Sequence, residues 1–475
     1  MSIGFARQFS LEGAALSAPG RSGWVEIDVP DRSCFGFSTQ PIPGGDGAPP
    51  SSWGLAGKVA EVLTGEEPPF EPLRKLLLNK SEVQPMIDLN PSTNDRRVLD
   101  AIREEALIAR NYARYYDENE HEFPPDQLPE AAGRPGFMAR LGERGVEDAG
   151  MAVLSTLIAM GQTWGDYSVR MRRNDRGLGN SALQAAGTDA QKHAWGHLVL
   201  AMAITEPGCG SDPSLVRTTA TRDGDQWVLN GEKIFVTTGC RADGVVVWAT
   251  IDRAAGRAGI KSFLVLKGTP GFIVAHKEKK LGIRADDTAA YVFQDCRIPR
   301  DHLLGGDEDI PTESSGGFRG VMKTFNMTRP MVAAIGLGMA EAALDFTRDA
   351  LRAAGVEVHY GPSLQGQPAA AERFIRLEAL FEAARLATLR ASWLADQGQT
   401  NNLEASIAKA KAGAAVRAIT QGCIEILGPM AVSRDHLLEK WFRDVRITDI
   451  YEGTGEIQRL IIARTLLGYS RNELK

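Results

Sequence analysis

The sequence predicts an α+β multidomain protein in which a helical domain is followed by an antiparallel β-domain and then by a helical bundle. Three observations support this order. Apolar residues recur every three or four positions in much of 93–199, which is the period of an amphipathic helix. Short β-prone runs separated by Gly, Asp and Pro fill about 200–305. Long alanine-rich runs with a helical period return from about 316.

The first 92 residues differ from the rest in composition. They include GGDGAPPSSWG and GEEPPFEPL, whose Gly and Pro content is typical of an irregular extension. One short amphipathic piece, 58–63, is expected to be helical. The N-terminus has no long apolar run and carries Glu12, so it is a poor match to a secretory signal. We therefore expect 1–92 to form an N-terminal extension.

The helical domain is expected to span 93–199. Asn94 is a candidate cap for a helix running DRRVLDAIREEALIARNYARYYDE, and Pro124 and Pro125 end this run. A second helix is predicted from about 148 to 165. Together these runs indicate a domain built from amphipathic helices.

The β-domain is expected to span 200–305. In WVLNGEKIFVTTG, Asn230 and Gly231 stand between two β-prone runs, which predicts a hairpin turn because both residues tolerate positive φ. The runs GVVVWATI, SFLVL, GFIVAHK and AAYVFQDCRI continue the pattern. Short strands with turn residues between them predict a small antiparallel sheet or barrel.

The C-terminal bundle is expected to span 306–475. Its three long helix-prone runs are VAAIGLGMAEAALDFTRDALRAAG, AAERFIRLEALFEAARLATLRASWLADQG and LEASIAKAKAGAAVRAITQGCIEILG. Antiparallel helices of this length pack into a bundle.

Composition and charge exclude several functional classes. The chain of 475 residues is 43% hydrophobic and 24% charged, with net charge −6 and a pI of about 5.8. This balance gives no basic face for nucleic acid and no electrostatic attraction to a membrane surface. The most apolar stretches, such as 332–344, are too short to span a bilayer. Five widely spaced cysteines without a CxxC pair indicate reduced thiols and a cytoplasmic protein.

Three motifs carry candidate chemistry, and each also has a plain structural reading. The turn AITEPGCGSD at 203–212 offers backbone amides that could hold an anion, or it is an ordinary turn. In KIFVTTG, Phe235 and Thr237 share a strand face, where they could cover a planar heterocycle or join the core. In DIYEGTGEIQRLIIAR, Glu452 lies on a loop or helix start, as a general base or as a carboxylate that complements a helix dipole.

Other catalytic classes find little support. His193 and His197 are four residues apart, but the HExxH glutamate is missing and no third metal ligand is evident. No GxSxG elbow occurs, which removes the usual sign of an α/β-hydrolase.

Taken in order, these motifs resemble the acyl-CoA dehydrogenase family over roughly 93–475. The matching segments are TEPGCGSD, WVLNGEKIFVTTG, LGIRADDT with YVFQDCRIP, the helix start FNMTRP, and RDVRITDIYEGTGEIQRLIIAR. The resemblance implies a helical domain, a β-domain and a four-helix bundle, with FAD between the last two. It also implies oxidation of an acyl-CoA thioester, with electrons passed to an electron-transfer flavoprotein.

The resemblance also implies a role for each matching residue. Glu452 would be the base that removes the α-proton while the β-hydrogen leaves as hydride to the flavin. The residues expected near FAD are Thr205, Ser211, Phe235, Thr237, Thr454 and Glu456. The residues expected near the acyl-CoA are Ser211, Arg329, Tyr451 and Gly453.

The chain departs from the family at two elements that reach a neighbouring subunit's FAD. Glu357 stands where an arginine is usual, and Arg352 is the nearest replacement. The glycine-rich stretch is altered at Glu425, Gly428, Pro429 and Ala431. A homodimer or homotetramer with rearranged FAD contacts is expected, and the alternative is a hetero-oligomer in which a sister chain supplies these contacts. An acyl-CoA oxidase and a non-catalytic partner subunit are the other readings, and acyl chain length is left open.

Overall fold

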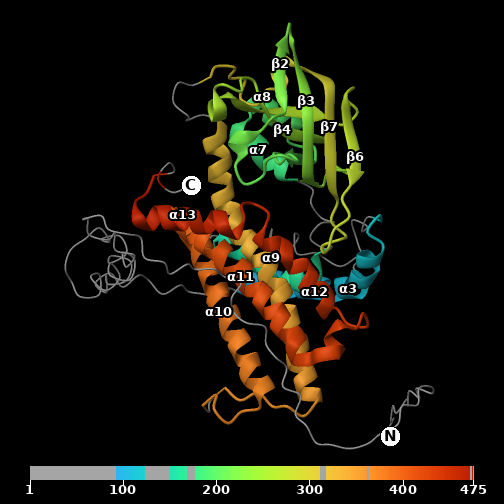
Figure 1. Ribbon diagram of the computed structural model, residues 1–475, viewed down its shortest axis with the longest axis vertical. Helices are drawn as coiled ribbons and strands as arrows, with labels where there is room; N and C mark the ends of the chain where they lie inside the picture. The colour runs from blue at the N-terminus through green and yellow to red at the C-terminus, as the bar shows by residue number, and fades with distance from the viewer. Residues whose placement is uncertain are drawn as a thin grey trace, which may run out of the picture. The chain divides into compact units, whose positions relative to one another are not determined.

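The computed structural model describes residues 93–122, 150–167, 177–310, 317–360, 363–470 and 473. The expected N-terminal extension, with its short helix at 58–63, lies outside these residues. Figure 1 labels most of the helices and strands of the described part.

In the part of the chain that the structure describes, four helices precede the sheet. They are α3 (Thr93–Glu118), α5 (Met151–Gly165), α7 (Leu178–Ala186) and α8 (Asp189–Trp195). Helices α3 and α5 pack through buried side chains that include Val98 and Ile102 from α3 and Leu154 and Ile158 from α5. The two helices predicted from apolar periodicity are thus present, and α3 ends before the two prolines. Thr188 caps α8 by accepting a hydrogen bond from the Gln191 amide.

The middle region is a seven-stranded sheet. Its strands are β1 (Leu200–Ala203), β2 (Thr219–Asp223), β3 (Gln226–Thr237), β4 (Gly244–Thr250), β5 (Ile260–Leu266), β6 (Phe272–Lys277) and β7 (Thr288–Pro299). Their order is β1-β4-β2-β3-β7-β6, and β5 also pairs with β4. Most pairs are antiparallel as predicted, but β1 runs parallel to β4 and β2 meets β4 in parallel at one position. Every residue of β4 is buried, which explains the apolar run that precedes Thr250.

The hairpin turn predicted at Asn230 and Gly231 is wrong, because β3 runs straight through both residues. The chain turns earlier, at Gly224 and Asp225, where Asp223 pairs with Gln226. At Asn230 the register with β7 shifts by a β-bulge. A Cβ on Gly231 would lie 2.5 Å from Thr218 Oγ1, so this glycine is required for close packing. Sheet pairing thus overrode the local turn preference.

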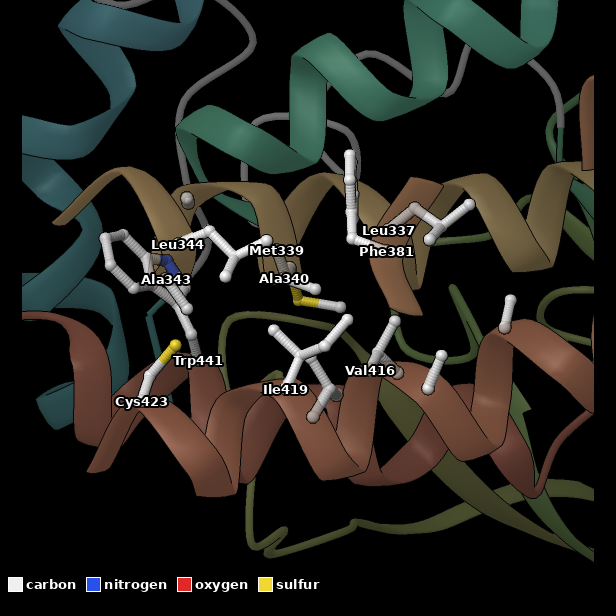
Figure 2. Packing of buried hydrophobic residues seen from close by; sticks show 14 of the residues in the cluster. Leu337, Met339, Ala340, Ala343, Leu344, Phe381, Val416, Ile419, Cys423 and Trp441 are labelled. Carbon is white, nitrogen blue, oxygen red and sulfur yellow. The ribbon is translucent and has the colours of Figure 1, made fainter. Parts of the chain in front are cut away.

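The C-terminal region is built from long helices, α9 (Gly317–Ala353), α10 (Ala369–Asp396) and α11 (Asn402–Leu427), followed by α12 (Leu438–Asp444) and α13 (Gly455–Leu467). The three long helices pack on one another and α13 packs on α11. Figure 2 shows Leu337, Leu344, Phe381, Ile419 and Trp441 meeting in their core. FNMTRP lies inside α9 and not at its start, so Pro330 is accommodated within a helix.

Short 3-10 helices connect these elements. They are η2 (Pro213–Leu215), η3 (Gly256–Gly259), η4 (Arg300–His302), η5 (Gly428–Val432) and η6 (Val445–Asp449). The last of these leads directly into the segment that contains Glu452.

One part of α9, Thr328–Ala353, has the length and composition of a membrane span. The apolar stretch 332–344 is thus part of a longer apolar helix than the sequence indicated. However, 78% of its most apolar window is buried inside the protein. This helix therefore supplies the core of the bundle with apolar side chains.

Candidate active site

The turn that follows β1 is held by a buried ion pair. The Glu206 carboxylate accepts hydrogen bonds from the Lys233 ammonium at 2.8 Å and from the Thr218 hydroxyl at 2.6 Å. It also accepts from the amides of Arg217 and Thr218. Burial raises the pKa of Glu206, but Lys233 and these donors together bring it below its ordinary value. The turn is thus fixed by an ionised carboxylate.

Thr205, Phe235 and Thr237 lie at one end of the sheet. The Ile234 amide donates to the Thr205 carbonyl at 2.9 Å, which ties the turn to β3. A register shift next to Phe235 and its φ of 58° leave the ring 61% exposed, whereas Val236 is buried. An exposed aromatic ring beside two threonines fits a planar heterocycle with polar edges. Phe235 is therefore not a core residue.

The loop before β7 connects the segment after β3 to α12. The Asp287 side chain accepts hydrogen bonds from the amides of Cys240 and Arg241, both at 3.0 Å, and its carbonyl accepts from the Thr238 amide. In the same loop, the Ile283 amide donates to Asp444 at 2.6 Å. The LGIRADDT loop therefore links Thr238 to a helix that lies a few residues before Glu452.

Glu452 has a strained backbone. Its φ is 55°, in the left-handed region that side chains disfavour, and Gly453 follows with a φ of 88°. Among the described residues, the other non-glycine residues with positive φ include Phe235, Thr238 and Ile283. Such strain costs of order 1–3 kcal/mol and clusters at functional sites. Here it marks Glu452, Phe235 with the nearby Thr238, and the loop that leads to α12, whereas the remaining such residue, Asp295, lies within β7.

Two residues of α9 interact with the Glu452 carboxylate. The Thr328 hydroxyl donates a hydrogen bond to it at 2.6 Å. Arg329 is buried, and burial lowers the pKa of its guanidinium while the Glu452 carboxylate acts in the opposite direction. A hydroxyl donor and a nearby cation both favour the ionised carboxylate. Both interactions therefore stabilise Glu452 in its charged form.

Two side chains missed by the sequence analysis hold the turn itself. The buried Lys409 ammonium donates to the Gly453 carbonyl. The Gln458 amide donates to the carbonyls of Glu452 and Gly453 at 3.3 and 3.2 Å. The available signal for Lys409 was a lysine on an otherwise alanine-lined helix face.

The other predicted residues lie either next to Glu452 or in the turn after β1, near Thr205. Tyr451 and Gly453 flank Glu452, and Thr454 caps α13 by accepting from the Ile457 amide at 3.3 Å. Glu456 is exposed in the first turn of α13, and Ser211 is exposed in the turn after β1. The structure brings Glu452 and Arg329 together and groups Thr205 with Phe235.

The residues that depart from the family pattern lie mostly at the surface. Glu357 is exposed, 3.3 Å from His359, and Arg352 pairs with Asp349 at 3.6 Å. Glu425 forms an ion pair with Arg373. The other altered positions fall in η5, where Gly428 has positive φ, Pro429 is exposed and Ala431 is buried.

Within the described residues, no group of three His, Cys, Asp or Glu side chains is placed to hold a metal ion. The cysteines in that part of the chain, Cys209, Cys240, Cys296 and Cys423, are free thiols.

The chain is similar to several known proteins. The models for the acyl-CoA dehydrogenase middle domain and C-terminal domain match residues 201–296 and 315–467. The chain is 38% identical over 369 residues to the short-chain specific acyl-CoA dehydrogenase of Bos taurus, covering 74% of this chain and 84% of that protein.

Two solved structures have the same fold. Butyryl-CoA dehydrogenase from Megasphaera elsdenii matches with a TM-score of 0.66 and 28% identity, covering 80% of this chain and all of that one. A chain described as the electron transferring flavoprotein of Acidaminococcus fermentans matches with a TM-score of 0.67 and 30% identity over 80% of this chain and all of that one. The chain belongs to the acyl-CoA dehydrogenase family of FAD-dependent enzymes.

Proposed function

We propose that this protein catalyses the α,β-dehydrogenation of an acyl-CoA thioester to the trans-2-enoyl-CoA, with Glu452 as the base. The observation that carries the proposal is the turn at Glu452. A carboxylate in a strained, left-handed backbone accepts a hydrogen bond from Thr328 and faces the buried Arg329. Its geometry is imposed by tertiary contacts, as expected of a group that acts on a weakly acidic C–H bond.

The base must be ionised before it can remove the α-proton. The Thr328 hydroxyl stabilises the carboxylate through a charge-assisted hydrogen bond, which is among the stronger kinds in proteins. Arg329 adds positive charge from a buried position. In the proposed reaction the α-proton is transferred to this carboxylate.

The residues at the end of the sheet fit the cofactor of the family. Phe235 would pack against the flavin ring, while Thr205 and Thr237 would hydrogen-bond its polar edge. Thr454 and Glu456, at the start of α13, would approach FAD, and Ser211 would lie near both FAD and CoA. When bound, FAD supplies the acceptor for the β-hydrogen, which leaves the substrate as hydride.

We further infer a short acyl chain and an electron-transfer flavoprotein as the electron acceptor. The Bos taurus relative is named as short-chain specific, and the Megasphaera elsdenii structure is a butyryl-CoA dehydrogenase. The similarity to a chain described as an electron transferring flavoprotein supports the acceptor.

The test is an anaerobic titration of the purified protein with a panel of acyl-CoA thioesters, following the visible band of oxidised flavin. Short straight-chain thioesters are expected to bleach it. The Glu452→Gln variant should keep bound flavin but lose bleaching by several orders of magnitude. The matched control, Glu382→Gln, changes a surface glutamate paired with Arg385 on α10 and should behave like the wild type.

Two results would contradict the proposal. Full bleaching by Glu452→Gln would remove Glu452 as the base. If the protein binds flavin but no thioester bleaches it, acyl-CoA thioesters are not its substrates.

Two further outcomes would identify the alternatives. Steady release of hydrogen peroxide would identify an oxidase, and flavin binding only with a co-expressed second chain would identify a hetero-oligomer.

A further inference from the structure

Lys409 is buried in a helix face that is otherwise made of small, uncharged residues. Its neighbours on α11 include Ala405, Ala408 and Ala412, and its side chain is 0% exposed. Burial of an ammonium group is costly unless charges or hydrogen bonds compensate for it. Burial lowers its pKa to about 8, against the opposing carboxylates of Asp449 and Glu452. Such a position calls for a specific partner.

The partner is the turn that carries Glu452. The Lys409 ammonium donates to the Gly453 carbonyl, and the Gln458 amide donates to that carbonyl and to the one before it. Both carbonyls belong to residues with left-handed backbone. A strained turn persists only where its surroundings hold it. These two buried side chains therefore fix the backbone of Glu452.

Lys409 also acts on Glu452 through charge. The charged groups around it are Asp449 from η6, Glu452 from the turn, Glu456 from α13 and Arg329 from α9. The three carboxylates favour the ammonium form, and Arg329 disfavours it. Asp449 is itself held by Arg417 at 3.1 Å. Lys409 and Arg329 are thus two cations that act on Glu452 from different helices.

We propose that Lys409 is a positioning residue for Glu452, holding its turn in the left-handed conformation and keeping its carboxylate ionised. The inference rests on the proposed role of Glu452 as base. Lys409 reaches Glu452 through the Gly453 carbonyl and through charge, and it takes no proton from the substrate.

The test compares Lys409→Met, Lys409→Arg and Lys411→Met. Lys411 is exposed on the same helix and serves as the control. Lys409→Met should lower kcat about 100-fold, because small misplacement of a catalytic group has effects of this size. The acid limb of its pH profile should move up by about one unit, because a lost neighbouring cation raises a carboxylate's pKa. Lys409→Arg keeps the positive charge, so the acid limb of its pH profile should stay in place. Lys411→Met should match the wild type.

A second readout needs neither substrate nor turnover. Carbodiimides modify protonated carboxyl groups, so the pH at which Glu452 becomes half-reactive can be followed by peptide mass spectrometry. This pH should also move up in Lys409→Met. If that variant does not fold, Lys409→Gln takes its place.

Lys409→Met or Lys409→Gln could lose stability while the acid limb and the pH of half-modification stay unchanged. That result would show that Lys409 is purely structural and would overturn the proposal. Failure of the proposed function is distinct from this result, because it appears as full activity in Glu452→Gln or as no bleaching in the wild type.

Discussion

At the residue scale, the properties of Glu452 come partly from its neighbours in sequence and partly from distant residues. The glycines that follow it predicted a loop or helix start, and the structure places it just before α13. Its contacts could not be predicted, because Thr328 is 124 residues away and Lys409 contacts the turn from another helix. Thr328 and Arg329 were also expected near a helix start, whereas they lie inside α9.

The hydrogen bond from Thr328 can be removed with little change in shape. Thr328→Val deletes the hydroxyl, and hydrogen bonds to charged groups contribute about 1.5–3 kcal/mol. We expect kcat to fall roughly 10–100-fold, since about 1.4 kcal/mol corresponds to a factor of ten. The acid limb of the pH profile should move upward, because the lost donor favoured the ionised carboxylate. Thr328→Ser keeps the hydroxyl and should stay near wild type, and an unchanged profile for Thr328→Val would argue against this contact.

At the element scale, β3 shows how pairing partners override local preference. Asn230 and Gly231 form a bulge within the strand because β7 pairs with both halves of it. The second irregularity, before Val236, exposes Phe235. Lys233 lies between the two bulges and points to Glu206, so the same strand both presents the ring and fixes the turn after β1.

The ion pair of this element gives a prediction with a defined pH dependence. Glu206→Gln leaves the buried Lys233 ammonium without its counter-ion and should destabilise the protein by about 3–5 kcal/mol at pH 7. The pKa of Glu206 is lower in the folded state than in the unfolded state. Its contribution to folding stability is therefore present above the pKa of the unfolded state and is lost as the pH falls through the pKa of the folded state. In denaturant unfolding, the difference in unfolding free energy between variant and wild type should therefore become smaller below about pH 4.5. A gap independent of pH would contradict this assignment.

At the scale of the whole molecule, a second buried cluster joins the β-region to the helices. The Lys440 ammonium contacts Asp166 and Asp444, both at 2.6 Å, and Asp444 also accepts from the Ile283 amide. Burial lowers the pKa of Lys440, but the two carboxylates together raise it above its ordinary value. The cluster therefore connects the end of α5, α12 and the loop before β7.

Lys440→Met would leave two buried carboxylates without their cation. We expect the denaturation midpoint to fall by the equivalent of about 3–5 kcal/mol. The control, Lys192→Met, removes a surface lysine 3.7 Å from Asp189 and should change stability by at most about 1 kcal/mol. Adding Asp444→Asn to Lys440→Met should recover part of the loss, and an equal effect of the two lysine variants would exclude a linking role.

The sequence by itself determined the family, the order of helical and β-regions and the position of Glu452 on a loop. These features follow from local patterns, namely apolar periodicity and glycine placement. Only the tertiary structure decided that Asn230 forms a bulge, that Phe235 is exposed and that Lys409 holds the Glu452 turn. Each of these depends on a partner distant in sequence, and single-sequence patterns carry no information on which distant groups meet.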